Sequence, residues 1–301
     1  MTGAIICQEL ILVFLSKNSY TFLMKTIVIH FNPDLDAITG AWIIKRFLKG
    51  WKKAEIAFVP AGELYQDMPV DSNPEILHVD TGLGELDHHQ TDEYICAAQL
   101  CHRKTKNQKL KIKDIDNEAL ERLCEVVCEV DHGRDISWPD SENDRYLFFL
   151  EEILGGLNSI YQDDGQVVEF GLKALDGIFK VLKDKIKAEE ILEGPRAIKF
   201  ETRWGRGVGV TTENEAVLTV GEKMGYSLVV KKDSRIGNIR IYARWDRKVD
   251  LTKVYQQLKE LDSEATWFLH ASKCLLLNGS TRNPKMKPTK LSLQEIIAVL
   301  K

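Results

Sequence analysis

The sequence predicts an α/β protein, and three observations support this fold class. Short apolar runs over residues 27–31, 55–59 and 76–80 have the length of buried strands, and the first and third end in polar residues. Apolar residues at helical spacing follow the first run, as in a strand that leads into a helix. Strand-like patterns resume after a compositional shift at Gly194-Pro195. We therefore expect a parallel-sheet N-terminal domain, a helical connector and a smaller α+β C-terminal domain.

The composition is that of an ordinary globular protein. The 301 residues are 44% hydrophobic and 29% charged, with a formal net charge of -4. This charge argues against a protein that binds nucleic acid over its whole surface, although it allows a local basic groove. Six cysteines form no C-x-x-C pair, which favours free thiols in a reducing cytoplasm.

The first 23 residues are expected to stand apart from the first domain. Residues 5–15 are apolar, but they follow no basic segment, include Glu9 and are too short to span a bilayer. We therefore expect no membrane partner. Met24-Lys25 leads directly into the first strand, which favours residues 1–23 as an accessory segment or as the result of a misplaced start codon. The alternative is that they form a genuine packed helix.

Residues 24–145 are expected to form the first domain. Its predicted strands and helices cover residues 27–31, 37–48, 55–59, 76–80 and 118–130. Gly133 should end the last of these helices, because glycine is favoured just past a helix C-terminus. The basic stretch 102–113 is predicted to be a solvated loop or helix edge, with His102 exposed.

A helical connector over residues 146–196 and a second domain over residues 197–301 are expected to follow. The connector is helical over 146–192, with breaks near Gly155-Gly156 and Asp163-Asp164-Gly165. The strands and helices predicted for the second domain cover residues 207–210, 214–224, 226–230, 239–243 and 251–261. No internal repeat is visible.

Acidic and histidine side chains follow several of the predicted strands and helices. They are His30, Asp34, Asp36, Asp80, Asp87, His88, His89 and Asp131. The carboxyl ends of parallel strands gather at one edge of a sheet, so these groups can meet there. Mg²⁺ and Mn²⁺ prefer carboxylate ligands, and Mn²⁺ also accepts imidazole. The pattern predicts a site for two divalent ions, although residues 30–36 alone would also suit a turn with Asx hydrogen bonds.

Four ordered motifs then resemble those of the DHH phosphoesterase superfamily. They are His30-x-x-x-Asp34-x-Asp36-Ala37, Val79-Asp80-Thr81, Asp87-His88-His89 and Asp131-His132-Gly133. That superfamily includes single-strand exonucleases, oligoribonucleases, cyclic-dinucleotide phosphodiesterases, family II pyrophosphatases and exopolyphosphatases. The resemblance covers about residues 25–135, and it is the order of four motifs, more than any one of them, that makes it specific.

The resemblance implies a ligand set for two Mn²⁺ or Mg²⁺ ions. His30 and Asp34 would hold one ion and Asp80 would bridge both. The ligands implied for the other ion are Asp36, His88 and Asp131.

The remaining motif residues are implied to serve catalysis and substrate binding. His89 would face the substrate phosphate and Asp87 would orient the histidines, beside the bridging Asp80. His132 and Arg134 are expected to contact substrate, since a guanidinium suits phosphate recognition.

The C-terminal domain departs from the superfamily pattern. Residues 265–273 keep a histidine, His270, where phosphodiesterase members carry a glycine-rich stretch ending in histidine, but the glycines are absent. Residues 278–290 form a basic, turn-rich segment that would compensate with phosphate contacts. We expect His270, Lys273 and Arg282 to bind substrate. The alternative for His270 is burial at the interface between the domains. The alternative for the basic side chains is that they form a solvated surface without a binding role.

Other conspicuous side chains have structural interpretations. His78 lies within a predicted strand and is expected to pack in the core. Trp204, Trp245 and Trp267 could stack on bases, but aromatic residues of a β-rich domain more often belong to its core.

These observations lead to the hypothesis of a metal-dependent phosphohydrolase in which a metal-activated water attacks phosphorus. Its expected substrate is a phosphate-containing small molecule or a short single-stranded nucleic acid, most plausibly an oligonucleotide or nucleotide, bound between the lobes of a monomer or homodimer. The alternatives are a pyrophosphatase-like enzyme and a non-catalytic metal-dependent nucleotide sensor.

Overall fold

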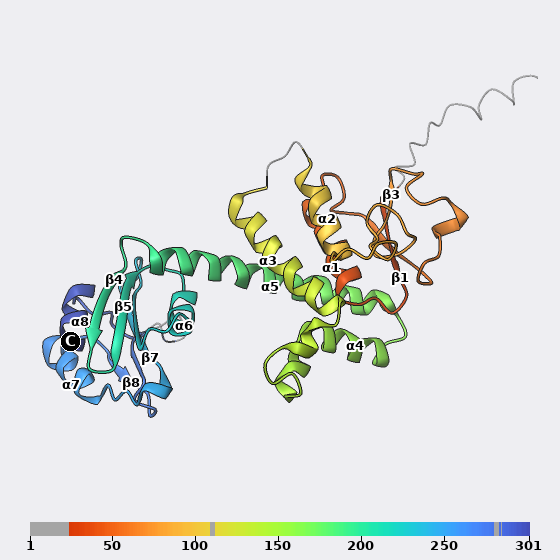
Figure 1. The fold of residues 1–301 in the computed structure, drawn as a ribbon. Helices are drawn as coiled ribbons and strands as arrows, with labels where there is room; N and C mark the ends of the chain where they lie inside the picture. The colour runs from red at the N-terminus through yellow and green to blue at the C-terminus, as the bar shows by residue number, and fades with distance from the viewer. Residues whose placement is uncertain (1–23, 109–111, 280–282, 284) are drawn as a thin grey trace, which may run out of the picture. The chain divides into compact units, whose positions relative to one another are not determined.

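The computed structural model describes residues 24–108, 112–279, 283 and 285–301, and it has a mixed α/β architecture (Figure 1). One sheet has three parallel strands and the other has six strands of mixed direction. The chain divides into two compact units, and the second contains residues 112–123 and 174–301. The predictions for residues 1–23 and for Arg282 lie outside the described residues.

The first unit is built on the parallel sheet. Its strands are β1 (Thr26–His30), β2 (Glu55–Val59) and β3 (Ile76–His78), in the order β2-β1-β3. Ile27, Val28 and Ile29 of the central strand are fully buried, as expected for a strand of a parallel sheet that is covered on both faces. The predicted strands are confirmed; β1 ends at His30, and β3 ends at His78, two residues before Asp80.

Two helices pack together over this sheet. Helix α1 (Leu35–Phe47) is buried from Leu35 to Ile44, and it contacts both β1 and α2 (Ala97–Lys106). The prediction for the basic stretch was partly wrong, because α2 extends into it and His102 is only 5% exposed. Ala98, Cys101, His102 and Thr105 share the buried face of α2, whereas its basic side chains lie on the outer face.

The rest of the chain up to the second sheet is helical. The elements are α3 (Asp114–Asp131), η2 (Arg134–Ser137), η3 (Asp144–Phe148), α4 (Leu150–Ile160) and α5 (Asp164–Glu193). Gly133 has a φ of 61° and ends α3 as predicted. The predicted break at Gly155-Gly156 was wrong, because α4 continues through both glycines. A glycine costs only about 1 kcal/mol within a helix, so packing and helix propagation can outweigh it.

The second unit contains the mixed sheet, in the order β4-β5-β6-β7-β9-β8. Its strands are β4 (Ile198–Thr202), β5 (Gly205–Thr211), β6 (Leu228–Lys232), β7 (Ile239–Ala243), β8 (Phe268–Leu269) and β9 (Leu275–Asn278). Its helices are α6 (Ala216–Lys223), α7 (Thr252–Leu261) and α8 (Leu293–Leu300). Strands β4, β8 and β9 and helix α8 were not predicted from the sequence.

Helices cover both faces of this sheet (Figure 1). The side chains of α7 and α8 pack with Leu228 and Val230 on one face, and α6 and the end of α5 pack with Val229 on the other. Trp267 is buried in the first of these clusters and Trp204 packs against it. Trp245 is 86% exposed, so its assignment to the core was wrong.

Several smaller predictions concern single residues and the membrane. His78 is 3% exposed, and its Nε2 accepts a hydrogen bond from the backbone N–H of Tyr65, so its place in the core is confirmed. Cys96, Cys101, Cys124, Cys128 and Cys274 are free thiols, as predicted. Over the part of the chain that the structure describes, no helix has the length and apolar character needed to cross a bilayer.

We expect opposite effects from alanine at two helical glycines. A Cβ at Gly40 of α1 would lie 2.5 Å from Val79 Cγ1, whereas a Cβ at Gly177 of α5 would have nothing within 4 Å. Gly40→Ala should lower the free energy of unfolding by about 1–3 kcal/mol through overpacking. Gly177→Ala should raise it by about 0.5–1 kcal/mol. Urea unfolding of both variants checks this; a neutral Gly40→Ala would contradict the packing of α1 against Val79.

Candidate metal centre

The turn from β1 into α1 places two side chains of the predicted site. Asp34 caps α1, since its Oδ1 accepts a hydrogen bond from Ala37 N–H at 3.0 Å. Its Oδ2 lies 3.5 Å from Nε2 of His30. The Nδ1 of His30 hydrogen-bonds the Phe31 carbonyl at 2.8 Å, which fixes the ring and leaves Nε2 facing the acids.

Asp80 occupies the centre of the arrangement. It follows β3, is 3% exposed and has a φ of 57°, a left-handed conformation that is uncommon outside glycine. Its Oδ2 lies 3.5 Å from His30 Nε2, and its Oδ1 lies 3.4 Å from His88 Nε2. The two oxygens of one buried carboxylate therefore face two different histidines.

The second histidine has acids of its own. Nε2 of His88 lies 3.8 Å from Asp36 Oδ2 and 3.6 Å from Asp131 Oδ2. Asp36 also holds the N-terminus of α2, because its two oxygens accept hydrogen bonds from Ala97 N–H at 2.7 Å and Ala98 N–H at 2.8 Å. One acid thus faces the site and anchors a neighbouring helix.

Asp87 orients the adjoining histidine. Its Oδ1 accepts a hydrogen bond from Nδ1 of His89 at 2.7 Å, and its Oδ2 accepts one from Leu83 N–H at 2.7 Å. With Nδ1 so occupied, the Nε2 of His89 is left on a side chain that is 58% exposed. His89 also reaches Asp80, whose Oδ1 lies 3.7 Å from its Nδ1.

Within the part of the chain that the structure describes, two buried polar atoms at the centre have no hydrogen-bond partner. They are Oδ1 of Asp80 and Nε2 of His88. Buried polar atoms are rarely left unpaired, and an ion between two such atoms satisfies both. Carboxylates and imidazoles within 4.8 Å of one another form three overlapping groups: Asp80, His88 and His89; His88, Asp131 and His132; and His30, Asp34 and Asp80. This donor set fits Mn²⁺, which accepts both ligand types.

Close packing of acids and histidines shifts their ionisation. Burial would lower the pKa of His30, but Asp34 and Asp80 outweigh it and raise the pKa to about 11. The carboxylate of Asp80 raises the pKa of His88 to about 9. Burial would raise the pKa of Asp80, but the two histidines lower it to about 2. Burial raises the pKa of Asp36 and that of Asp131. Without a cation, the histidines therefore carry the charge that balances the acids.

The residues after α3 form one rim of the site. Nδ1 of His132 donates a hydrogen bond to the Cys128 carbonyl at 3.0 Å and lies 3.2 Å from Asp131 Oδ2. The guanidinium carbon of Arg134 lies 3.5 Å from the ring centroid of Tyr94, and this ring also packs edge-on against His132. His132 and Arg134 thus lie beside the predicted ligands.

Two nearby residues were missed by the sequence analysis. Tyr94 supports Arg134, and Glu151 of α4 accepts a hydrogen bond from Leu35 N–H at 3.0 Å, next to Asp34. Glu151 lies 116 residues from Leu35 in sequence, so no local pattern signals this contact.

The predicted substrate-binding residues of the C-terminal domain belong to the second unit. His270 is exposed in the turn between β8 and β9, where its Nδ1 accepts a hydrogen bond from Ser272 N–H at 3.1 Å. Lys273 Nζ lies 3.1 Å from Asp250 Oδ2, in an exposed ion pair. Their role in substrate binding stays a prediction.

No family model matches the chain, and neither does any curated protein. The resemblance to the DHH phosphoesterases therefore remains a hypothesis that rests on the four motifs and on the geometry just described.

Mn²⁺ binding should strengthen as the pH rises. His30 and His88 must lose their protons to bind a cation, and their raised pKa values keep them protonated through neutral pH. For each proton displaced, the apparent Kd should fall about tenfold per pH unit between pH 6.5 and 8.5. Calorimetry in buffers of different ionisation enthalpy measures both the Kd and the protons released. His270→Ala, which removes no proposed metal ligand, should leave this dependence unchanged. A pH-independent Kd with no proton release would refute the assignment.

Proposed function

We propose that the chain is a divalent-metal-dependent phosphohydrolase of the DHH phosphoesterase type. The observation that carries this proposal is the position of Asp80, whose two oxygens face different histidines, each with further acids. The proposed ligands are His30, Asp34 and Asp80 for one ion, and Asp80, Asp36, His88 and Asp131 for the other. Bound Mn²⁺ or Mg²⁺ would supply an activated water and would neutralise charge on a phosphoryl group.

Side chains around the ligands suit a phosphate substrate. His89 exposes its Nε2 while Asp87 fixes the ring, so it can donate a hydrogen bond or a proton to a phosphoryl oxygen. Arg134 offers a guanidinium that Tyr94 holds in place beside the site. These groups suit a phosphodiester or phosphoanhydride, and the substrate that we propose is a short oligonucleotide or a nucleotide.

A non-catalytic nucleotide sensor is the second candidate. The stretch before His270 supports it, since residues 265–269 contain no glycine where phosphodiesterase members of the superfamily carry a glycine-rich stretch that ends in histidine. A side chain there keeps the backbone from approaching a phosphate closely. The alternative within the enzyme class is a pyrophosphatase, because its small anionic substrate requires no contacts with a nucleotide base.

A panel of substrates separates these functions. Bis-(p-nitrophenyl) phosphate, pyrophosphate, cyclic dinucleotides and short RNAs should each be incubated with the protein and Mn²⁺, and then with Mg²⁺. Hydrolysis of a diester supports the proposed phosphodiesterase activity, and hydrolysis of pyrophosphate alone supports a pyrophosphatase. Metal binding without any hydrolysis would reject the enzyme in favour of the sensor.

Asp80→Asn and His88→Ala should each lower turnover of the preferred substrate by about 10³-fold or more, because each removes a proposed ligand of an ion worth several kcal/mol to the transition state. Asparagine tolerates the left-handed backbone at position 80, so this variant should fold. Asp92→Asn, an exposed control in the following loop, should keep wild-type turnover. The test compares steady-state rates of variants with unchanged circular dichroism spectra; full activity of Asp80→Asn would overturn the assigned site.

A further inference from the structure

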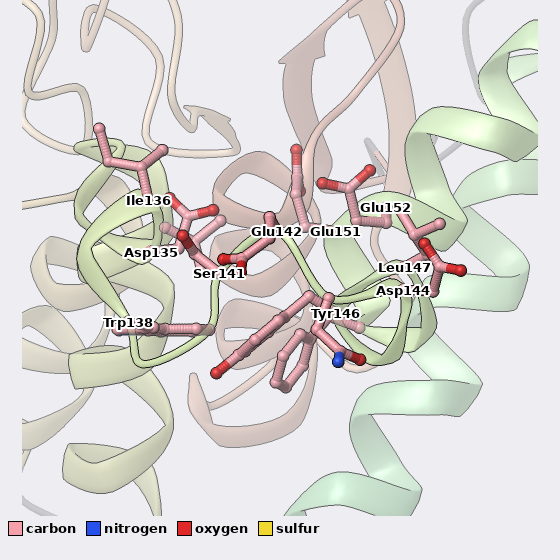
Figure 2. A pocket seen from close by; sticks show the side chains of 13 residues that line it. Asp135, Ile136, Trp138, Ser141, Glu142, Asp144, Tyr146, Leu147, Glu151 and Glu152 are labelled. Carbon is pink, nitrogen blue, oxygen red and sulfur yellow. The ribbon is translucent and has the colours of Figure 1, made fainter.

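A cavity of about 350 Å³ lies between η2, η3 and the start of α4 in the first unit (Figure 2). Among the described residues that line it, none is a proposed metal ligand, although Glu151 lies next to Asp34 and Val130 directly precedes Asp131. Most of its lining residues are apolar or aromatic side chains or carboxylates, and Ser141 and Asn143 are the others. The structure pairs an apolar floor with an acidic border, and this combination restricts what can bind there.

The apolar part is preformed and partly open to solvent. The rings of Trp138, Tyr146 and Phe149 pack on one another with centroids 5.3–5.9 Å apart. Ile136 and Leu147 also line the cavity, although they are 75% and 60% exposed. Large apolar side chains that gather at an open cavity are typical of an interaction site, whereas scattered ones are ordinary.

The charged side chains that line the described cavity are all acidic, and Ser141 and Asn143 add neutral polar groups. The carboxylates that line the cavity are those of Asp135, Glu142, Asp144, Glu151 and Glu152. Within the described chain, no lysine or arginine lines the cavity, and Asp135, Glu142, Asp144 and Glu152 form no ion pair. The neighbouring Arg145 is paired with Asp140. Figure 2 shows Asp135, Glu142 and Glu152 together on one side of the rings of Trp138 and Tyr146.

We propose that this cavity is the docking site for a short basic segment of a partner protein. One large apolar side chain of the segment would insert against Trp138 and Tyr146, and flanking lysines or arginines would pair with the acids. Charge complementarity carries this choice, because the acids attract a basic segment and repel the phosphates of a nucleotide or a nucleic acid. Burying the exposed Ile136 and Leu147 would add to the affinity.

A random heptapeptide library selected on the immobilised full-length protein tests the proposal. The enriched peptides should contain a large apolar residue flanked by lysine or arginine. The best of them, synthesised and titrated by calorimetry, should bind more weakly as salt increases. Failure to enrich any peptide, or enrichment of peptides without basic residues, would overturn the proposal. Competition by a mononucleotide would do the same, because it would assign the cavity to a substrate.

Exposed substitutions locate the binding site without disturbing the fold. Ile136→Ser and Glu142→Gln should each raise the Kd of the selected peptide by about fivefold or more, as expected for loss of an apolar contact or of a charge at a docking site. Leu261→Ser removes an exposed apolar side chain of α7 in the other unit and should leave the affinity unchanged. Equal binding by wild type, Ile136→Ser and Glu142→Gln would refute docking at this cavity. The peptide Kd is read without any activity assay, so its outcome is independent of the proposed hydrolysis.

Discussion

The carboxylate of Asp80 is the constraint on which the first unit depends. It is buried in a left-handed backbone conformation after β3, with one oxygen toward His30 and the other toward His88. Both histidines compensate its charge while no cation is present, which is why their pKa values are raised and that of Asp80 is lowered. A divalent cation that binds this site in the folded protein and not in the unfolded chain should stabilise the folded protein.

The same acids that face this centre also hold the surrounding helices. Asp34 caps α1, and Asp36 anchors the first residues of α2. A carboxylate is favourable at a helix N-terminus because the free N–H groups there carry partial positive charge. The fold and the centre are therefore specified by the same side chains. Removing Asp36 should therefore remove hydrogen bonds to the N-terminus of α2 as well as a proposed metal ligand. Asp80 and His88, in contrast, act mainly as proposed metal ligands.

Local patterns predicted which acidic and histidine side chains lie close together, because these side chains follow buried strands or end a helix. His30 and Asp80 follow strands, and Gly133 marks the end of the helix that carries Asp131. Contacts between distant segments were not predictable: Glu151 reaches Leu35 across 116 residues. His102 was misjudged because its basic neighbours concealed the buried face of α2. The short strands β8 and β9, of two and four residues, carry too few residues to show a period.

Crystals grown with Mn²⁺ and measured at the manganese absorption edge test the central claim most directly. Our account predicts two anomalous peaks on either side of the Asp80 carboxylate, about 3.5–4 Å apart. One peak should contact His30 and Asp34, and the other should contact His88 and Asp131. A fully occupied Mn²⁺ site elsewhere, with no anomalous density at Asp80, would contradict the account.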